Sequence, residues 1–154
     1  MNNENTNYCQ SVSAVVIKNE KVLLARHNYG IGKGKLIIPG GYVNIGETPQ
    51  EALIREYMEE TQIKIKPINI IAVRFNMHDW YIVFRAEYIS GEAQSDNDEN
   101  SEVEWINITD ALSREDVPDL TKKLIKSAIS EKEGLSYKDF QSNTKYTPYS
   151  LYCL

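Results

Sequence analysis

One helix in the middle of the chain can be placed from the sequence almost to the residue, and it constrains the fold around it. Thr48 suits the N-cap, Pro49 suits the first helical position, and Glu51 completes a capping box of the form T-x-x-E. We expect this helix to extend to Thr61. The rest of the chain must then supply a surface against which one face of the helix is buried.

The two faces of this helix differ in chemistry. With about 100° per residue, one arc collects the residues that we expect to pack against a sheet: Leu53, Ile54, Tyr57, Met58 and Thr61. The opposite arc collects Ala52, Arg55, Glu56, Glu59 and Glu60. Three of these are carboxylates at i,i+3 and i,i+4 spacing, so they are lateral neighbours on the helix surface.

Such clustering is unfavourable in a helix that binds nothing. Like charges at i,i+4 cost a few tenths of a kcal/mol per pair, and the C-terminal end of the helix dipole favours cations. Arg55 offsets one negative charge but not three. A hard divalent cation would resolve the conflict, because Mg²⁺ binds carboxylate oxygens and keeps water and phosphate as its other ligands. A solvated acidic helix face is the alternative interpretation.

Segments of strand-like composition flank the helix on both sides. The segment 11–18 is rich in β-branched residues, and 21–26 is its expected hairpin partner across a turn at Asn19-Glu20. We expect further strands at 36–38, 63–75, 80–89 and 103–108, a second helix at 117–130, and loops at 29–35 and 91–104. Strands mixed with two well-separated helices predict an α/β layered fold in a single domain.

Charge and composition limit the partners and the location. The formal net charge of −5 disfavours a nucleic acid polymer as a partner. The first ten residues lack the basic and apolar regions of a signal peptide, and no apolar run approaches the length of a membrane span. We therefore expect a cytoplasmic protein without a membrane partner. Cys9 and Cys153 are expected to be reduced thiols rather than a disulfide joining the two ends.

A pair of glycines precedes the acidic helix. Gly40 and Gly41 follow Pro39, and paired glycines let the backbone approach a ligand or ion closely and expose carbonyl groups as ligands. Glu47 is placed to hold this loop to Arg55 through a charge-assisted hydrogen bond. An ordinary strand-to-helix turn that needs positive φ angles is the alternative.

The segment Gly41–Ile63, GYVNIGETPQEALIREYMEETQI, resembles the Nudix box, written G-x5-E-x7-R-E-U-x-E-E-x-G-U with U an apolar residue. The positions in register are Gly41, Glu47, Arg55, Glu56, Glu59, Glu60 and Ile63. The resemblance implies a Nudix-like α/β/α sandwich with a mixed β-sheet. It also implies that residues 1–130 form a Nudix hydrolase domain, followed by a polar, tyrosine-bearing tail at 131–154.

Two positions depart from the family pattern. Gln62 replaces the second glycine, which usually forms a left-handed helix cap, and a non-glycine residue adopts that conformation at a cost of roughly 1 kcal/mol. Tyr57 stands where a smaller aliphatic residue is usual, and we expect it to face the core. No acidic position is lost, which argues against a relative that binds nucleotides without cutting them.

Carried over by position, the resemblance implies a Mg²⁺ site, with Mn²⁺ as an alternative ion. Its ligands would be Glu56, Glu59, Glu60 and the carbonyl of Gly40, with Arg55 and Glu47 orienting them.

Members of the family often supply one more carboxylate from a loop ahead of a short strand that ends in tryptophan. Glu99, six residues before Trp105, is the best match, and Asp98 and Glu102 are alternates. Its role would be that of a metal ligand or a general base.

The implied reaction is the attack of water on a diphosphate bond, with Glu59 or Glu99 accepting the proton. Candidate substrate contacts are Arg26, Lys33, Lys35 and Tyr81, although the three cations could equally belong to a solvated loop. The substrate is open among nucleoside triphosphates, including oxidised forms, dinucleoside polyphosphates and ADP-ribose-like molecules.

Two other functions stay open at this point. The first is a nucleotide-binding regulator that uses the same fold without hydrolysis. The second is an interaction protein that assembles, for example as a homodimer, through its tyrosine-bearing tail. The same tail could instead cover the core or the active site.

Overall fold

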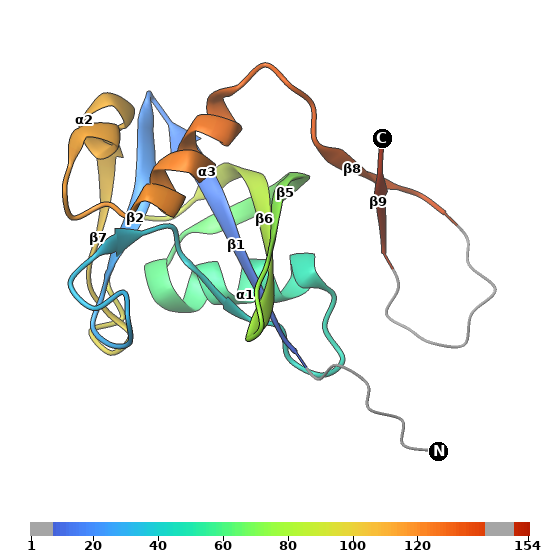
Figure 1. Cartoon of the computed structure of the whole chain (residues 1–154), viewed down its shortest axis with the longest axis horizontal. Helices are drawn as coiled ribbons and strands as arrows, with labels where there is room; N and C mark the ends of the chain where they lie inside the picture. The colour runs from blue at the N-terminus through green and yellow to red at the C-terminus, as the bar shows by residue number, and fades with distance from the viewer. Residues whose placement is uncertain (1–7, 141–149) are drawn as a thin grey trace.

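A mixed β-sheet with helices on both faces organises the molecule (Figure 1). The structure is a computed structural model, and it describes residues 8–140 and 150–154. Within that part the strands are β1 (Cys9–Lys18), β2 (Lys21–His27), β3 (Leu36–Ile37), β4 (Gly40–Tyr42), β5 (Lys64–Phe75), β6 (Asp79–Ser90), β7 (Asn100–Asn107), β8 (Leu135–Lys138) and β9 (Leu151–Cys153). The helices are α1 (Pro49–Thr61), α2 (Ile108–Ser113) and α3 (Asp119–Ile129).

The sheet order is β3-β2-β1-β6-β5-β8-β9, with β4 paired to β1 and β7 paired to β2. β1 and β6 run parallel, and the other pairs are antiparallel. The predicted turn between β1 and β2 is confirmed. Asn19 and Glu20 both have positive φ, 49° and 59°, which matches the twist of a two-residue hairpin.

Each face of the sheet has its own apolar core. On one face Leu53 and Tyr57 of α1 pack in a cluster with Phe84. On the other face Leu124 and Ile125 of α3 belong to a second cluster. Figure 1 shows α1 and α3 on opposite sides of the sheet, so the expected α/β/α sandwich is confirmed.

Both ends of α1 follow the local sequence. Thr48 donates its backbone N–H to the Glu51 carboxylate at 2.8 Å, which is one half of the predicted capping box. Gln62 adopts the left-handed conformation, with φ 61°, and its N–H donates to the carbonyl of Met58 at 3.1 Å. Gln62 therefore takes the left-handed conformation expected of this cap. Tyr57 is fully buried, as expected, and its hydroxyl donates to the carbonyl of Ala14 at 2.5 Å.

The buried face of α1 differs from the predicted one. Ile54 and Met58 were expected to be buried, but each is 40% exposed. Ala52 and Glu60 were expected on the outer face, but both are buried, and Glu60 is only 3% exposed. The helix is rotated in this way because Gly40 and Gly41 leave room beside it for carboxylates, as described below.

The segment after residue 91 also differs from the prediction. The acidic loop ends at Glu99 rather than at Glu104, because β7 begins at Asn100 and pairs along the whole of β2. Glu102 and Glu104 of β7 are exposed, so this strand has a polar composition like that of a loop. Helix α2 was not predicted, since it is only six residues long.

Part of the predicted tail belongs to the sheet. β8 pairs with β5, and β9 pairs with β8 (Figure 1). Tyr152 makes edge contacts with Phe84 and Tyr137, at ring-centroid distances of 5.4 Å and 5.8 Å. Tyr146 and Tyr149 lie outside the described residues. Cys9 and Cys153 are free thiols, as expected.

In the part of the chain that the structure describes, no helix is both long enough and apolar enough to cross a membrane.

Candidate active site

The glycine pair lies directly against two of the predicted acids. The N–H of Gly40 donates to Glu60 Oε2 at 3.3 Å. A Cβ at Gly41 would lie 2.3 Å from the carboxyl carbon of Glu56, and a Cβ at Gly40 would lie 2.1 Å from the carbonyl oxygen of Val12. Glycine at position 40 is therefore required for the pairing of β4 with β1, and glycine at position 41 leaves the space that the Glu56 carboxyl group occupies.

Arg55 joins the loop before α1 to the acids. It makes a two-pronged contact with Glu47, at 2.6 Å and 3.0 Å, and it also donates to the carbonyl of Tyr42 at 3.0 Å. Its Nη1 lies 2.6 Å from Glu56 and 3.3 Å from Glu59. The predicted contact between Glu47 and Arg55 is confirmed, and hydrogen bonds from Arg55 hold the pKa of Glu47 below its usual value.

The acids differ in exposure and therefore in electrostatics. Burial raises the pKa of Glu60 to about 9, against the Gly40 hydrogen bond, and the charges of Glu99 and Glu56 act in the same direction as burial. Burial also raises the pKa of Glu56, although Arg55 opposes this effect. The side chain of Glu59 is 60% exposed. Glu56 and Glu60 are crowded and partly desolvated, so a neighbouring cation would stabilise their charged forms most.

This donor set fits a hard divalent ion. Glu56, Glu59 and Glu60 offer carboxylate oxygens, the ligands that Mg²⁺ prefers. Across residues 8–140 and 150–154, no three acidic, histidine or cysteine side chains already converge on one point as metal ligands. Arg55 bridges Glu56 and Glu59 at short distances, so these two carboxylates would have to turn from Arg55 toward an ion.

Glu99 is the member of the acidic loop that approaches the box acids. Its carboxylate accepts a hydrogen bond from the Tyr29 hydroxyl at 3.3 Å, and its charge acts on Glu60. The alternate Glu102 lies in an ion pair with Arg26 at 2.8 Å. The alternate Asp98 makes a contact through its backbone: its carbonyl accepts a hydrogen bond from Asn28 Nδ2 at 3.0 Å.

A pocket of about 440 Å³ opens beside Gly40 and Gly41. Tyr81, a predicted substrate contact, lies in its wall, and burial raises the pKa of this phenol to about 12. Arg74 lies with its guanidinium carbon 5.2 Å from the centre of the Tyr81 ring and donates to Asp79 at 2.7 Å. Among the described residues, Arg74 is the one arginine or lysine that lines this pocket, and the Asp79 carboxylate neutralises its charge.

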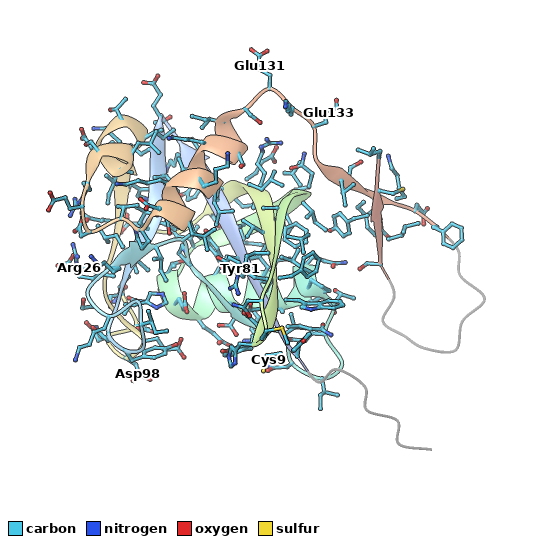
Figure 2. The ribbon with its side chains drawn as sticks, viewed as in Figure 1. Cys9, Arg26, Tyr81, Asp98, Glu131 and Glu133 are labelled. Carbon is cyan, nitrogen blue, oxygen red and sulfur yellow. The ribbon has the colours of Figure 1, made fainter. Side chains whose placement is uncertain are left out.

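The three upstream cations are placed differently from one another. Arg26 pairs with Glu102 and Asp116, at 2.8 Å and 3.1 Å, and donates to the carbonyl of Gly34 at 2.8 Å. These contacts close the loop after β2. Lys33 and Lys35 are exposed in that loop. Figure 2 shows Arg26, Tyr81 and Asp98 well away from Glu131 and Glu133.

Arg26 leads to a prediction about stability, because Asp116 also accepts hydrogen bonds from Arg114, at 2.7 Å and 2.8 Å. The two arginines hold the pKa of Asp116 well below its usual value. A lowered pKa stabilises the fold above the usual value of 3.8 and loses that contribution as the pH falls further. We expect Asp116→Asn to cost about 1 kcal/mol near neutral pH.

The measurement is urea unfolding of both proteins near pH 7 and near pH 3. The difference between them should shrink at the lower pH. The matched control is Glu115→Gln, which changes an exposed neighbouring acid and should show little difference at either pH. A cost for Asp116→Asn that stays the same at both pH values would contradict the ion-pair explanation.

Several residues of the site escaped prediction from the sequence. Tyr29, Arg74 and Asp79 line the pocket, and Asn100 donates from Nδ2 to the carbonyl of Glu60 at 3.1 Å. None of them belongs to a motif. Their proximity depends on strand pairing, and the one available signal was the position of Asp79 at the start of a strand after a short polar turn.

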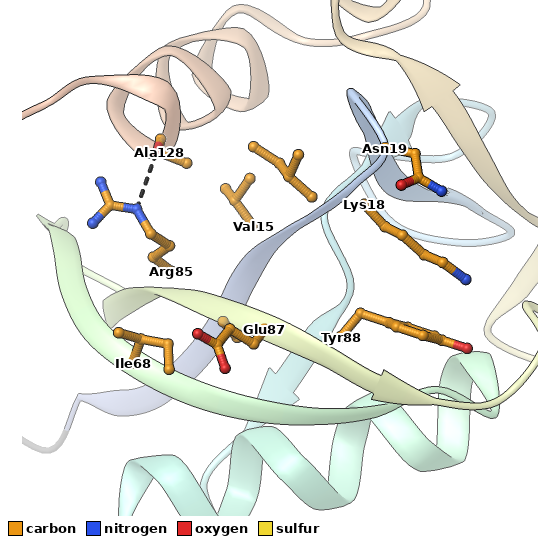
Figure 3. A pocket seen from close by; sticks show the side chains of 10 residues that line it. Val15, Lys18, Asn19, Ile68, Arg85, Glu87, Tyr88 and Ala128 are labelled. Atoms are coloured by element: carbon orange, nitrogen blue, oxygen red, sulfur yellow. Dashed lines mark hydrogen bonds between the residues drawn. The ribbon is translucent and has the colours of Figure 1, made fainter.

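A second pocket, of about 540 Å³, lies at the other end of α3 (Figure 3). Val15, Ile68 and Ala128 form apolar parts of its wall. There the Nε of Arg85 donates to the carbonyl of Ala128 at 3.0 Å, which caps the end of α3. None of the predicted site residues lines this pocket, whereas Gly40 and Tyr81 line the smaller one, which is therefore the candidate active site.

Comparisons with known proteins agree with this geometry. A family model described as the NUDIX domain matches residues 7–127. An ADP-ribose pyrophosphatase of Methanocaldococcus jannaschii is 30% identical over 133 residues, which cover 80% of this chain and 75% of that protein. The NAD-capped RNA hydrolase NudC of Photorhabdus laumondii is 34% identical over 104 residues, which cover 64% of this chain. The match spans only 40% of the length of that relative.

Among solved structures, a NUDIX hydrolase from Nitrosomonas europaea superimposes with a TM-score of 0.71. The match covers 80% of this chain and 70% of that chain at 21% identity, so it supports the fold alone. The family model, by contrast, covers most of the sequence and includes the acidic helix with its glycine loop. The chain belongs to the Nudix family.

Proposed function

We propose that this protein hydrolyses a diphosphate bond in a nucleoside diphosphate-linked small molecule, with Mg²⁺ as its cofactor. The observation that carries the proposal is the buried carboxyl of Glu60, held by Gly40 beside Glu56 and next to a pocket of about 440 Å³. A buried acid of raised pKa among other acids is typical of a functional site rather than of a solvated helix face.

Within this proposal each acid has its own part. Glu56, Glu59, Glu60 and the carbonyl of Gly40 are the proposed ligands, with Glu99 as a further ligand from outside the helix. When bound, a divalent ion neutralises charge on the diphosphate and lowers the pKa of water. Arg55 orients the acids through Glu56 and Glu47, which fixes the loop before α1.

The proton of the attacking water needs a carboxylate acceptor within hydrogen-bond reach. Glu59 is a candidate because its side chain is exposed, with a hydrogen bond from Arg55 at 3.3 Å. Glu99 is the other candidate because it lies in the acidic loop next to the pocket-lining Tyr29. Glu59→Gln tests the first candidate, with Glu131→Gln as the control at a distant acid.

The pocket supports a nucleoside part rather than further phosphate groups. Arg74, a cation of its wall, already pairs with Asp79. Tyr29, Tyr42 and Tyr81 offer aromatic surface for a base. The relatives named for ADP-ribose and for NAD-capped RNA both suggest an adenosine diphosphate linked to a further group. Arg26, Lys33 and Lys35 remain predicted phosphate contacts.

The experiment is a hydrolysis screen of the full chain with and without Mg²⁺. The panel holds nucleoside triphosphates, ADP-ribose, NAD⁺, dinucleoside polyphosphates, nucleotide sugars and an NAD-capped oligoribonucleotide, and products are separated by chromatography. We expect Mg²⁺-dependent release of a nucleoside monophosphate from at least one small member. Preference for the capped oligoribonucleotide would contradict our prediction that no nucleic acid polymer is a partner.

The second candidate function is a nucleotide-binding regulator that does not hydrolyse. Binding of ADP-ribose in calorimetry, without product from any member of the panel, would favour it over the enzyme. We further propose that residues 1–130 form the catalytic domain, with 131–154 as a tail whose strands β8 and β9 extend the sheet, and that the protein is cytoplasmic. A homodimer formed through the tail also remains a prediction.

A further inference from the structure

The loop that carries Glu99 is tied to two other parts of the candidate site. The N–H of Asn28 donates to the carbonyl of Glu99 at 3.0 Å, and Asn28 Nδ2 donates to the carbonyl of Asp98 at 3.0 Å. On the other side, Asn100 Nδ2 donates to the carbonyl of Glu60 at 3.1 Å, at the end of α1. The main chain at Glu99 is therefore fixed between the loop after β2 and the acidic helix.

The side chain of Glu99 is not fixed by these backbone contacts. Glu99 is exposed, and ordering a free glutamate side chain opposes binding by up to about 2 kcal/mol. The hydroxyl of Tyr29 restrains it, through a hydrogen bond to Oε2 at 3.3 Å. A donor from a neutral phenol to a carboxylate orients that group without cancelling its charge.

Tyr29 also belongs to the pocket. Its ring stacks on His27, with a centroid distance of 5.9 Å and an angle of 29° between the planes. The residue nevertheless stays 55% exposed and forms part of the pocket wall. One residue thus contacts both the cavity that receives the substrate and the carboxylate outside the Nudix box.

We infer that Tyr29 is a positioning residue, which orients Glu99 toward the box acids and links that orientation to occupation of the pocket. The inference rests on the proposed function, in which Glu99 serves as a ligand or as the base. If Tyr29 did no more than line the pocket, its aromatic ring would be sufficient. The positioning role requires the hydroxyl, and this difference makes the two roles separable.

The test compares Tyr29→Phe, which keeps the ring, with Glu99→Gln and with the double variant. With ADP-ribose as substrate, we expect Tyr29→Phe to lower kcat about tenfold with KM within about twofold. In the background of Glu99→Gln, the same change should have no further effect, because the hydroxyl then has no carboxylate to orient.

A second readout does not depend on turnover. Binding of Mn²⁺ to the free enzyme, measured from the electron paramagnetic resonance signal of unbound Mn²⁺, should be a few-fold weaker in Tyr29→Phe. The free energy of unfolding should be unchanged within about 0.5 kcal/mol, since this hydroxyl is at the surface. Tyr29→Leu, which also removes the ring, should raise KM in addition.

The outcomes separate this inference from the proposed function. A fully active Glu99→Gln enzyme would remove Glu99 from the mechanism, and the role of Tyr29 would fall with it. An impaired Glu99→Gln enzyme combined with an unchanged Tyr29→Phe enzyme would overturn only the inference about Tyr29. A tenfold loss that persists in the double variant would also overturn it, because the hydroxyl would then act on something other than Glu99.

Discussion

Replacing Glu59 by glutamine should lower kcat by about 10³-fold or more and leave the fold intact. Glu59 is a proposed metal ligand and a candidate for the base, so glutamine would remove a negative charge that the reaction needs. The side chain is 60% exposed and accepts a hydrogen bond from Arg55 at 3.3 Å, so the loss of its charge should change the free energy of unfolding by less than about 0.5 kcal/mol. The loss therefore reports on the chemistry alone.

The measurement is steady-state hydrolysis at saturating Mg²⁺, with urea unfolding of the same samples. The matched control is Glu131→Gln, which neutralises an exposed acid at a distance from the pocket (Figure 2). This variant should keep both its activity and its stability. A fully active Glu59→Gln enzyme would refute the role of Glu59, and equal losses in both variants would point to the net charge of the protein instead.

Gly41→Ala should mainly lower activity, whereas Gly40→Ala should mainly lower stability. At Gly41 the new Cβ would meet the carboxyl group of Glu56, at 2.3 Å from its carbon and 2.4 Å from Oε2. The far end of that side chain can move aside, so we expect a loss of stability below about 1 kcal/mol. The displaced carboxylate should lower kcat by about 10²-fold or more.

At Gly40 the new Cβ would meet backbone instead, 2.1 Å from the carbonyl oxygen of Val12 and 2.7 Å from the Cα of Ser13. Strand β4 would have to move away from β1, at a cost of about 3 kcal/mol or more. Each variant serves as the control for the other, in thermal unfolding and in hydrolysis. A Gly41→Ala protein that keeps full activity would show that Glu56 need not lie over this glycine.

The elements that depend on local sequence were predictable. The ends of α1 follow from Thr48, Glu51 and Gln62, because caps are made by residues within one turn of the helix end. The hairpin at Asn19-Glu20 was predictable for the same reason. The first three residues of β7, 100–102, were not, because these polar residues became part of the strand only by pairing with β2.

The candidate site divides in the same way. The order of Gly41, Glu47, Arg55 and the three glutamates was readable as a motif, since a helix of known register places i,i+3 and i,i+4 residues together. The rotation of that helix was not readable. Ile54 and Met58 were expected inside because they share a helical arc with Leu53 and Tyr57, but both are exposed, and a buried Glu60 lies against Gly40 instead.

By itself, then, the sequence determined which carboxylates share a helix face and where that helix begins and ends, because these are consequences of a 3.6-residue repeat and of hydrogen bonds within one turn. Only the tertiary structure decided which acid is buried, that Glu99 approaches the box with Tyr29, and that Arg74 meets Asp79. The reason is that these contacts join residues far apart in the chain, and their geometry is set by strand pairing and by the space that side chains leave.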